Sequence, residues 1–339
     1  MTTNESKLTK KDFTSDREVR WCPGCGDYAI LATVQTLLAD VGARPESTVF
    51  VSGIGCSSRF PYYMDTYGIH SIHGRAPAVA TGLAISRPDL DVWVITGDGD
   101  GLSIGGNHLM HALRRNVNLK ILLFNNEIYG LTKGQYSPTS PLGSQHKSTP
   151  MGSLDRPINP VSLALGVEAT YVARSIDTDR KHLTEALTGA YNHRGSAFVE
   201  IYQNCNVFND GAFMALKAPD QKDHNQIRLR QGEPITFGPD NERAVVAEDD
   251  GSMSFMDTEA AGERIVVHDA HREEPTTAFA LSRLSHNPTG PTPIGIFRDV
   301  ERPVYDELLR AQVKEAQDAK GKGDLAALLN SGNAWDVVG

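Results

Sequence analysis

Two groups of polar residues each directly follow a short apolar segment that is rich in β-branched side chains. Gly97-Asp98-Gly99-Asp100-Gly101 follows residues 92–96, and Asn125-Asn126 follows residues 119–124. Glycines let a backbone come close to an anion, but two carboxylates repel that anion unless a cation lies between them. Aspartate and asparagine oxygens are ligands that Mg²⁺ prefers. The pattern therefore predicts a site for a magnesium-bound diphosphate.

Other glycine-rich loops explain this segment less well. A dinucleotide-binding fingerprint requires a third glycine where Leu102 or Ile104 stands. A P-loop requires lysine and then serine or threonine where Asn107 and His108 stand. A purely structural turn accounts for the glycines and aspartates alone. It does not account for the two asparagines at the end of the next apolar segment.

The four cysteines form a second pattern. Cys22 and Cys25 precede a helical segment, Cys56 follows a strand segment, and Cys205 follows the last strand segment of the first 210 residues. A redox pair leaves Cys56 and Cys205 unexplained, and structural zinc usually takes two close pairs of ligands. Four thiolates at one edge of a sheet suit a [4Fe-4S] cluster. From spacing alone, a cluster, a zinc site and scattered buried thiols all stay open.

The segments that carry these motifs alternate between strand and helix patterns. We expect strands at residues 47–52, 92–96, 119–124, 169–173 and 197–202, and helices at residues 27–41, 76–85, 160–165 and 181–193. Parallel strands place the loops at their carboxyl ends along one edge of the sheet, where such sheets bind ligands. The expected fold is an α/β protein with a doubly wound, mostly parallel sheet.

Three regions differ in composition. Residues 1–20 are expected to form a polar N-terminal arm, and residues 21–210 the α/β domain with both sites. Residues 211–339 are expected to form a C-terminal extension that wraps the core or contacts a partner. Within the extension, residues 217–238 show little apolar periodicity, residues 247–260 are acidic and expected to be exposed, and residues 279–284 and 305–313 are expected to form short helices.

Composition narrows the class of protein. The chain has 339 residues, 40% apolar and 22% charged, with a formal net charge of −9. An acidic chain is not expected to bind nucleic acid, which favours a basic face. The first twenty residues hold no apolar stretch, and about twenty consecutive apolar residues occur nowhere, so neither secretion nor a membrane span is expected. We expect a cytoplasmic protein.

A series of motifs in order resembles one family of enzyme subunits. Gly97-Asp98-Gly99 with Asn125-Asn126 resembles the thiamine diphosphate motif. With it stand WCPGCG from Trp21, GIGCSS from Gly53, HGRA from His73, NNEIYGLTKGQYSPTSP from Asn125, the late Cys205, and PTPIGIF at residues 291–297. Together they are similar to the β subunits of the 2-oxoacid:ferredoxin oxidoreductases. The resemblance covers most of the chain and implies the thiamine diphosphate-binding fold.

The resemblance implies a role for each matching residue. Mg²⁺ is expected to bind Asp98, Asn126 and the carbonyl of Ile128, and one [4Fe-4S] cluster is expected to bind Cys22, Cys25, Cys56 and Cys205. Lys133 is expected to contact coenzyme A or the substrate, although an ordinary exposed lysine is the alternative. The residues expected to line thiamine diphosphate are Ile54, Gly55, Cys56, Ser57, His73, Gly97, Asp98, Gly99, Asp100, Gly130 and Leu131. For His73 the alternative is an ordinary loop histidine.

The same resemblance implies the reaction and the partners. These enzymes oxidatively decarboxylate a 2-oxoacid to an acyl-coenzyme A and pass single electrons to ferredoxin. The catalytic glutamate is expected on an α subunit, so no catalytic residue is assigned to this chain, and an αβ pair that dimerises is expected. The segment GLTKGQYSPTSP is more like the 2-oxoglutarate branch than the pyruvate branch. A pyruvate or branched-chain enzyme, and a non-redox thiamine diphosphate lyase, are the alternatives.

Overall fold

The computed structural model describes residues 7–285 and 290–337, and eight strands within these ranges form its main sheet. In order across the sheet they are β2 (Tyr67–His70), β1 (Thr48–Ser52), β3 (Asp91–Gly97), β4 (Lys120–Asn125), β8 (Ala197–Tyr202), β7 (Tyr171–Ile176), β13 (Thr292–Asp299) and β9 (Gln226–Leu229). The strands from β2 to β7 run parallel to their neighbours. β13 is antiparallel to β7, and β9 is parallel to β13.

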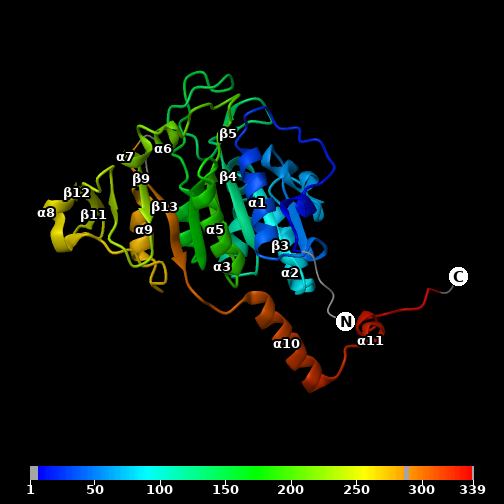
Figure 1. Cartoon of the computed structure of the whole chain (residues 1–339). Coiled ribbons are helices and arrows are strands. Elements are labelled where there is room, and N and C mark those ends of the chain that lie inside the picture. Colours follow the sequence, from blue (N-terminus) through cyan, green and yellow to red (C-terminus); the bar gives the residue numbers. More distant parts are fainter. Residues whose placement is uncertain (1–6, 286–289, 338–339) are drawn as a thin grey trace.

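Helices cover both faces of this sheet (Figure 1). In β3, Val92 and Val94 belong to one apolar core and Trp93 and Ile95 to the other. The first core contains residues of α2 (Ala76–Ser86), α3 (Gly106–Arg114), α4 (Pro160–Gly166) and α9 (Thr276–Arg283), and the second contains residues of α1 (Asp27–Asp40) and α5 (Arg180–Asn192). Burial on both faces explains why these strands read as continuous apolar runs. The predicted doubly wound α/β fold is confirmed.

The C-terminal part adds strands to the main sheet and forms a small sheet of its own. β9 and β13 come from this part of the chain, so it completes one edge of the main sheet. The small antiparallel sheet consists of β10 (Thr236–Phe237), β11 (Arg243–Ala247) and β12 (Met253–Asp257). Beyond β13, the helices α10 (Tyr305–Lys320) and α11 (Leu325–Leu329) project away from the sheet (Figure 1).

The remaining elements are short. Helical turns lie at Lys10–Phe13, Pro45–Ser47, Ser57–Tyr63 and Gly262–Arg264, short helices at α6 (Met214–Lys217), α7 (Lys222–Asn225) and α8 (Thr258–Ala261), and a hairpin at β5 (Ile128–Tyr129) and β6 (Gln135–Tyr136). No helix within the described ranges combines the length and the apolar character needed to cross a membrane.

The structure differs from the sequence expectations at three places. β2 was not expected, because its four residues are all exposed and do not form a continuous apolar run; pairing with β1 defines it. Residues 247–260 are not simply an exposed acidic segment, since β12 lies within them and pairs with β11. The helix expected at residues 305–313 continues to Lys320, because its mostly exposed second half contains good helix formers and no glycine.

The glycine-rich segment after β3 also differs from a simple turn. Asp98 and Gly99 are already helical, and a π-helical turn, Asp100–Ile104, connects them to α3. The loop before α2 lies directly against this turn, since a Cβ atom on Gly74 would come within 2.5 Å of the Gly105 nitrogen. Wide turns of this kind occur often at functional sites. The helix therefore begins at the first aspartate.

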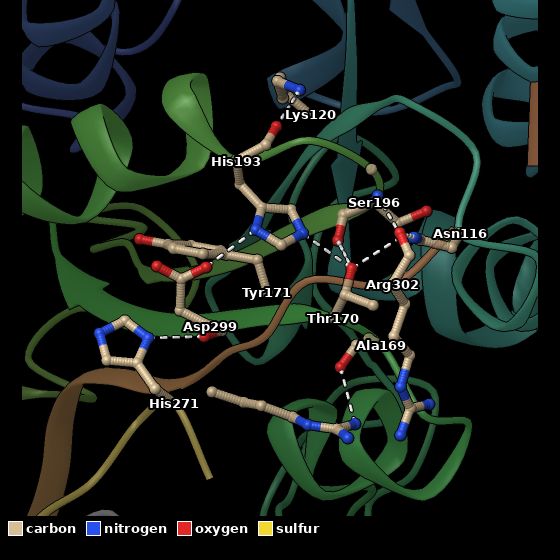
Figure 2. Close-up of polar contacts among 12 residues, drawn as sticks. Asn116, Lys120, Ala169, Thr170, Tyr171, His193, Ser196, His271, Asp299 and Arg302 are labelled. Carbon is tan, nitrogen blue, oxygen red and sulfur yellow. Dashed lines mark hydrogen bonds and ion pairs between the residues drawn. The ribbon is translucent and has the colours of Figure 1, made fainter. Parts of the chain in front are cut away.

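A buried hydrogen-bond network connects Asp299 of β13 with Thr170, the residue directly before β7 (Figure 2). The His193 ring contacts the Asp299 Oδ1 through Nδ1 and the Thr170 Oγ1 through Nε2, both at 2.8 Å. Thr170 Oγ1 also donates to Asn116 Oδ1 at 2.7 Å. The order threonine, histidine and aspartate resembles a hydrolase triad, but Thr170 is only 1% exposed. We therefore interpret the network as structural.

Replacement of His193 by alanine is expected to lower the free energy of unfolding by about 2–4 kcal/mol, because Thr170 and Asp299 lose a partner inside the protein. Denaturant unfolding followed by circular dichroism measures this change. His224→Ala is the matched control, since the His224 side chain is 58% exposed and its nearest carboxylate oxygen lies 3.9 Å away. Equal stability of the two variants would contradict the structural role.

Candidate functional site

A cavity opens at the carboxyl ends of β1, β3 and β4, where a doubly wound sheet is expected to bind ligands. Its lining consists of Ile54, Gly55, Cys56, Ser57, His73, Gly97, Asp98, Gly99, Asp100, Phe124, Asn126, Ile128, Tyr129, Gly130, Leu131 and Thr132. The structure thus brings together every residue that was expected to line thiamine diphosphate, along with Asn126 and Ile128. It does not bring Lys133 into this lining. Lys133 is exposed in the β5–β6 hairpin, with a left-handed φ of 76°.

Asp98 is a buried carboxylate on the wall of this cavity. Its side chain is 2% exposed, and the Oδ2 atom accepts a hydrogen bond from Thr139 Oγ1 at 2.7 Å. Burial raises the pKa of Asp98 from 3.8 to about 6, although hydrogen bonds from Ser137 and Thr139 oppose that rise. A buried carboxylate gains from a cation that restores its charge balance. Asp98 therefore suits a metal ion.

The segment after β4 directs alternate residues to opposite sides. Asn126 and Ile128 line the cavity, while Asn125 and Glu127 line a second cavity of about 590 Å³ behind it. The Asn126 Oδ1 atom accepts only the Ile128 N–H, at 3.2 Å, which leaves a lone pair for another ligand. An aspartate oxygen and an amide oxygen on one cavity form a donor set that fits Mg²⁺.

Asp100 positions the two loops that close the cavity. Its Oδ1 atom accepts from the backbone N–H groups of Ile54 at 3.1 Å and Gly74 at 2.7 Å, and lies 2.6 Å from His73 Nδ1. Its Oδ2 atom accepts from Thr96 Oγ1 at 2.7 Å. The carboxylate of Asp100 is therefore occupied by protein donors, and we interpret it as an anchor for the lining rather than a metal ligand.

The four cysteines approach the same cavity from three loops. Cys22 and Cys25 form a turn before α1, with the Cys25 N–H donating to the Cys22 carbonyl at 3.0 Å. Cys56 lies in the loop after β1, and Cys205 follows β8. A Cβ atom on Gly130 would lie 3.7 Å from the Cys56 Sγ and 3.5 Å from the Cys205 Sγ. Two cysteines that are 149 positions apart in the sequence thus lie beside the same lining glycine.

The electrostatics of these thiols favour a bound cationic group. Burial, together with the nearby Asp27, Cys205 and Cys22, raises the pKa of Cys56 to about 12. Burial and Asp27 also raise the pKa of Cys25. Thiols in such surroundings become thiolates when metal replaces their protons. The four side chains therefore fit an iron–sulfur cluster as ligands.

A single zinc ion fits this arrangement less well. Tetrahedral zinc with Zn–S bonds of about 2.3 Å needs its sulfur atoms less than about 4 Å apart. Among residues 7–285 and 290–337, no three histidine, cysteine, aspartate or glutamate side chains are arranged to hold one metal ion. A cluster carries its own iron and sulfide between its ligands, so its thiolates stand farther apart than those of a single ion.

Sequence reasoning missed three polar residues at this site. Thr139 Oγ1 lies between Asp98 Oδ2, at 2.7 Å, and Asn125 Oδ1, at 2.9 Å, and Tyr129 donates to the Gly99 carbonyl at 2.9 Å. Gln203 contacts both Asn126 and Cys25. Thr139 and Tyr129 belong to the long polar segment after the asparagine pair, so length and polarity were the available signal. Gln203 has no signal in the sequence.

The second cavity contains a buried ion pair. Arg174 Nε donates to Glu200 Oε2 at 2.6 Å, and both side chains are almost fully buried. Glu127 lines the same cavity, and burial, with the nearby charges of Asp98 and Glu200, raises its pKa to about 8. Glu127 also has a left-handed φ of 56°.

Comparison with known proteins agrees with this site. The family model of the C-terminal, thiamine pyrophosphate-binding domain of thiamine pyrophosphate enzymes matches residues 53–201. The 2-oxoglutarate oxidoreductase subunit KorB of Mycobacterium tuberculosis is 58% identical over 99% of this chain and 90% of its own length. The 2-oxoglutarate synthase subunit KorB of Methanocaldococcus jannaschii is 36% identical over 70% of this chain and 87% of its own.

A solved structure is similar over nearly the whole chain. It is a 2-oxoglutarate:ferredoxin oxidoreductase from Magnetococcus marinus with 2-oxoglutarate, coenzyme A and succinyl-CoA bound, and it matches with a TM-score of 0.76 and 34% identity over 98% of both chains. Fold and site define a thiamine diphosphate-binding enzyme subunit. The chain belongs to the family of 2-oxoacid:ferredoxin oxidoreductase β subunits, in its 2-oxoglutarate branch.

Proposed function

We propose that this chain is the β subunit of a cytoplasmic, coenzyme A-dependent 2-oxoglutarate:ferredoxin oxidoreductase. In the overall reaction 2-oxoglutarate, coenzyme A and two oxidised ferredoxins give succinyl-CoA, CO₂, two reduced ferredoxins and a proton. The supporting observation is that one cavity has Asp98 and Asn126 on its wall and the sulfur atoms of Cys56 and Cys205 beside its Gly130. An oxygen-ligand site and a sulfur-ligand site thus adjoin each other.

The residues of this chain hold the reacting groups in place. When bound, thiamine diphosphate supplies the carbon nucleophile that releases CO₂ from a 2-oxoacid, and a [4Fe-4S] cluster accepts electrons singly. Asp98, Asn126 and the Ile128 carbonyl would hold Mg²⁺ on the diphosphate. Cys22, Cys25, Cys56 and Cys205 would hold the cluster. Gly130, without a side chain, leaves the space between the two sites open.

An α subunit is proposed to complete the active site. The cavity lining contains no glutamate, the residue that thiamine enzymes need against the aminopyrimidine ring. Exposed apolar side chains lie on the same loops, with Ile72 next to His73 and Leu131 next to Gly130. Such exposed apolar groups favour a protein partner over solvent. We propose an αβ pair that dimerises and passes its electrons to ferredoxin.

The test is anaerobic co-expression of this chain with its α subunit. We expect the purified complex to contain iron and acid-labile sulfide and to reduce a low-potential dye only when 2-oxoglutarate, coenzyme A, thiamine diphosphate and Mg²⁺ are all present. The matched comparison replaces 2-oxoglutarate with pyruvate or a branched-chain 2-oxoacid. Faster reduction with either of these would contradict the substrate but not the class of reaction. Absence of iron would contradict the class.

Lys133 is proposed to contact coenzyme A or the substrate from the exposed hairpin. Lys133→Ala is expected to raise the KM for one of them by roughly 10-fold, since an ionic hydrogen bond contributes about 1.5–3 kcal/mol. Steady-state kinetics with each substrate varied in turn identifies which one. Lys147→Ala, at another exposed lysine, is the control. Unchanged KM values for both substrates would leave Lys133 as an ordinary surface lysine.

A further inference from the structure

Gln203 lies between the oxygen-ligand site and the sulfur-ligand site. It directly follows β8, its side chain is 1% exposed, and its backbone N–H donates to the Asn125 carbonyl at 2.8 Å, which extends the pairing of β8 with β4. The backbone of Gln203 is therefore fixed by the sheet. The side chain of Gln203 therefore extends from a Cα atom whose position relative to Asn125 is fixed.

The Gln203 amide joins three groups. Its Oε1 atom accepts from Asn126 Nδ2 at 2.9 Å, and its Nε2 atom donates to the Cys25 Sγ at 3.1 Å and to the Asn204 carbonyl at 2.6 Å. The reverse orientation of the amide would place Oε1 against a carbonyl oxygen and a sulfur, which are both acceptors, so the network selects one orientation. Across residues 7–285 and 290–337, this is the one side-chain hydrogen bond to a cysteine sulfur.

We propose that Gln203 is a positioning residue that couples the Mg²⁺ site to the iron–sulfur cluster. The inference rests on the proposed function and adds a residue to it. By accepting the Asn126 N–H, Gln203 turns the Asn126 Oδ1 atom toward the cavity and Mg²⁺. By donating to the Cys25 sulfur, it stabilises negative charge on that ligand. The two effects come from opposite ends of one amide.

The donor to Cys25 has a definite effect on the reduction potential. Reduction adds an electron to the cluster, so a hydrogen bond to a ligand sulfur stabilises the reduced form more than the oxidised form. The Cys25 side chain is partly buried, with Asp27 nearby, and the donor itself, Gln203, is 1% exposed, so water competes little with this hydrogen bond. Loss of the donor is therefore expected to make the potential more negative.

The test uses two variants of the αβ complex with the cluster in place. Gln203→Met removes both the acceptor for Asn126 and the donor to Cys25, while the volume of the side chain stays nearly the same. It is expected to shift the midpoint potential, measured by an EPR-monitored redox titration, to a more negative value. It is also expected to raise the Mg²⁺ concentration for half-maximal activation by about 10-fold, the usual effect of losing a group that orients a metal ligand. Gln203→Glu keeps an acceptor for Asn126 but replaces the amide donor. It is expected to lower the potential with little change in the Mg²⁺ requirement.

Gln226→Met is the matched control. Gln226 is also buried, its Nε2 atom donates to the Leu216 carbonyl at 2.6 Å, and β9 lies at the other end of the sheet from the cysteines. The control is expected to lose stability without a change in potential or Mg²⁺ requirement. A cluster potential equal to that of the wild type in both Gln203 variants would overturn the inference. A wild-type complex without iron and sulfide would instead overturn the proposed function.

Discussion

Replacement of Cys205 by alanine is expected to reduce 2-oxoglutarate-dependent ferredoxin reduction by the αβ complex to background. The Cys205 Sγ lies beside Gly130, which lines the same cavity as Asp98, so its loss would remove one of the four ligands of the proposed cluster. The iron and acid-labile sulfide content of the purified complex, its visible absorbance and its rate of ferredoxin reduction measure the effect.

The control for this variant comes from the same loop. Val207→Ala removes an exposed side chain two residues after Cys205 and is expected to leave iron content and activity unchanged. Cys205→Ser removes the sulfur atom but nearly keeps the size of the side chain, so it distinguishes loss of a ligand from loss of packing. It is expected to behave like Cys205→Ala. Full sulfide content together with full electron transfer in Cys205→Ala would show that Cys205 is not a ligand.

Replacement of Asp98 by asparagine is expected to lower activity by more than about 100-fold, since even groups that only orient a metal ligand are worth 10- to 100-fold. Asparagine keeps the shape of aspartate and can still accept the hydrogen bond from Thr139, but it would supply no negative charge to the proposed Mg²⁺. The increase in melting temperature on addition of thiamine diphosphate and Mg²⁺ measures binding separately from turnover. Asp250→Asn, an exposed aspartate far along the chain, is the control.

The same substitution is expected to stabilise the protein without its cofactors. Burial raises the pKa of Asp98 from 3.8 to about 6, so the folded protein holds this proton more tightly than the unfolded chain. Stability therefore falls as the pH rises from about 4 to about 6, by about 3 kcal/mol, and stays reduced above that range. Asp98→Asn removes this loss. At pH 7.5 the cofactor-free variant should unfold at a higher denaturant concentration than the wild type, and a lower midpoint would contradict the burial argument.

Several elements of the fold were predictable because their signals are local. The apolar runs of β1, β3, β4, β7 and β8 reflect burial on both faces of the sheet. Each run can be recognised from the residues of its own strand, without knowledge of the neighbouring strands. β2 was missed because its exposed residues carry no such pattern, and its pairing with β1 is all that makes it a strand. β12 was missed because its residues are only partly buried and acidic residues flank it on both sides.

The candidate site shows the same division between local and distant information. Asp98 and Asn126 belong to short motifs whose residue types alone predict oxygen ligands for Mg²⁺. Thr139 and Gln203 are ordinary residue types in segments without a motif, and their importance lies in hydrogen bonds to residues far away in the chain. Lys133 was expected by resemblance to contact coenzyme A or the substrate, and only the tertiary structure shows that the hairpin holds it at the surface, outside the lining of the cavity.

By itself, the sequence determined the alternating α/β pattern and the oxygen-ligand motif. It also placed the four cysteines before a helix segment and after two strand segments. Only the tertiary structure decided which of these groups meet. β8 pairs with β4, with Tyr202 opposite Asn125, and this register places Gln203 beside Asn126 and Cys205 beside Gly130. The order of strands in a sheet depends on how whole faces pack against helices, and that information is spread over the chain rather than contained in any one segment.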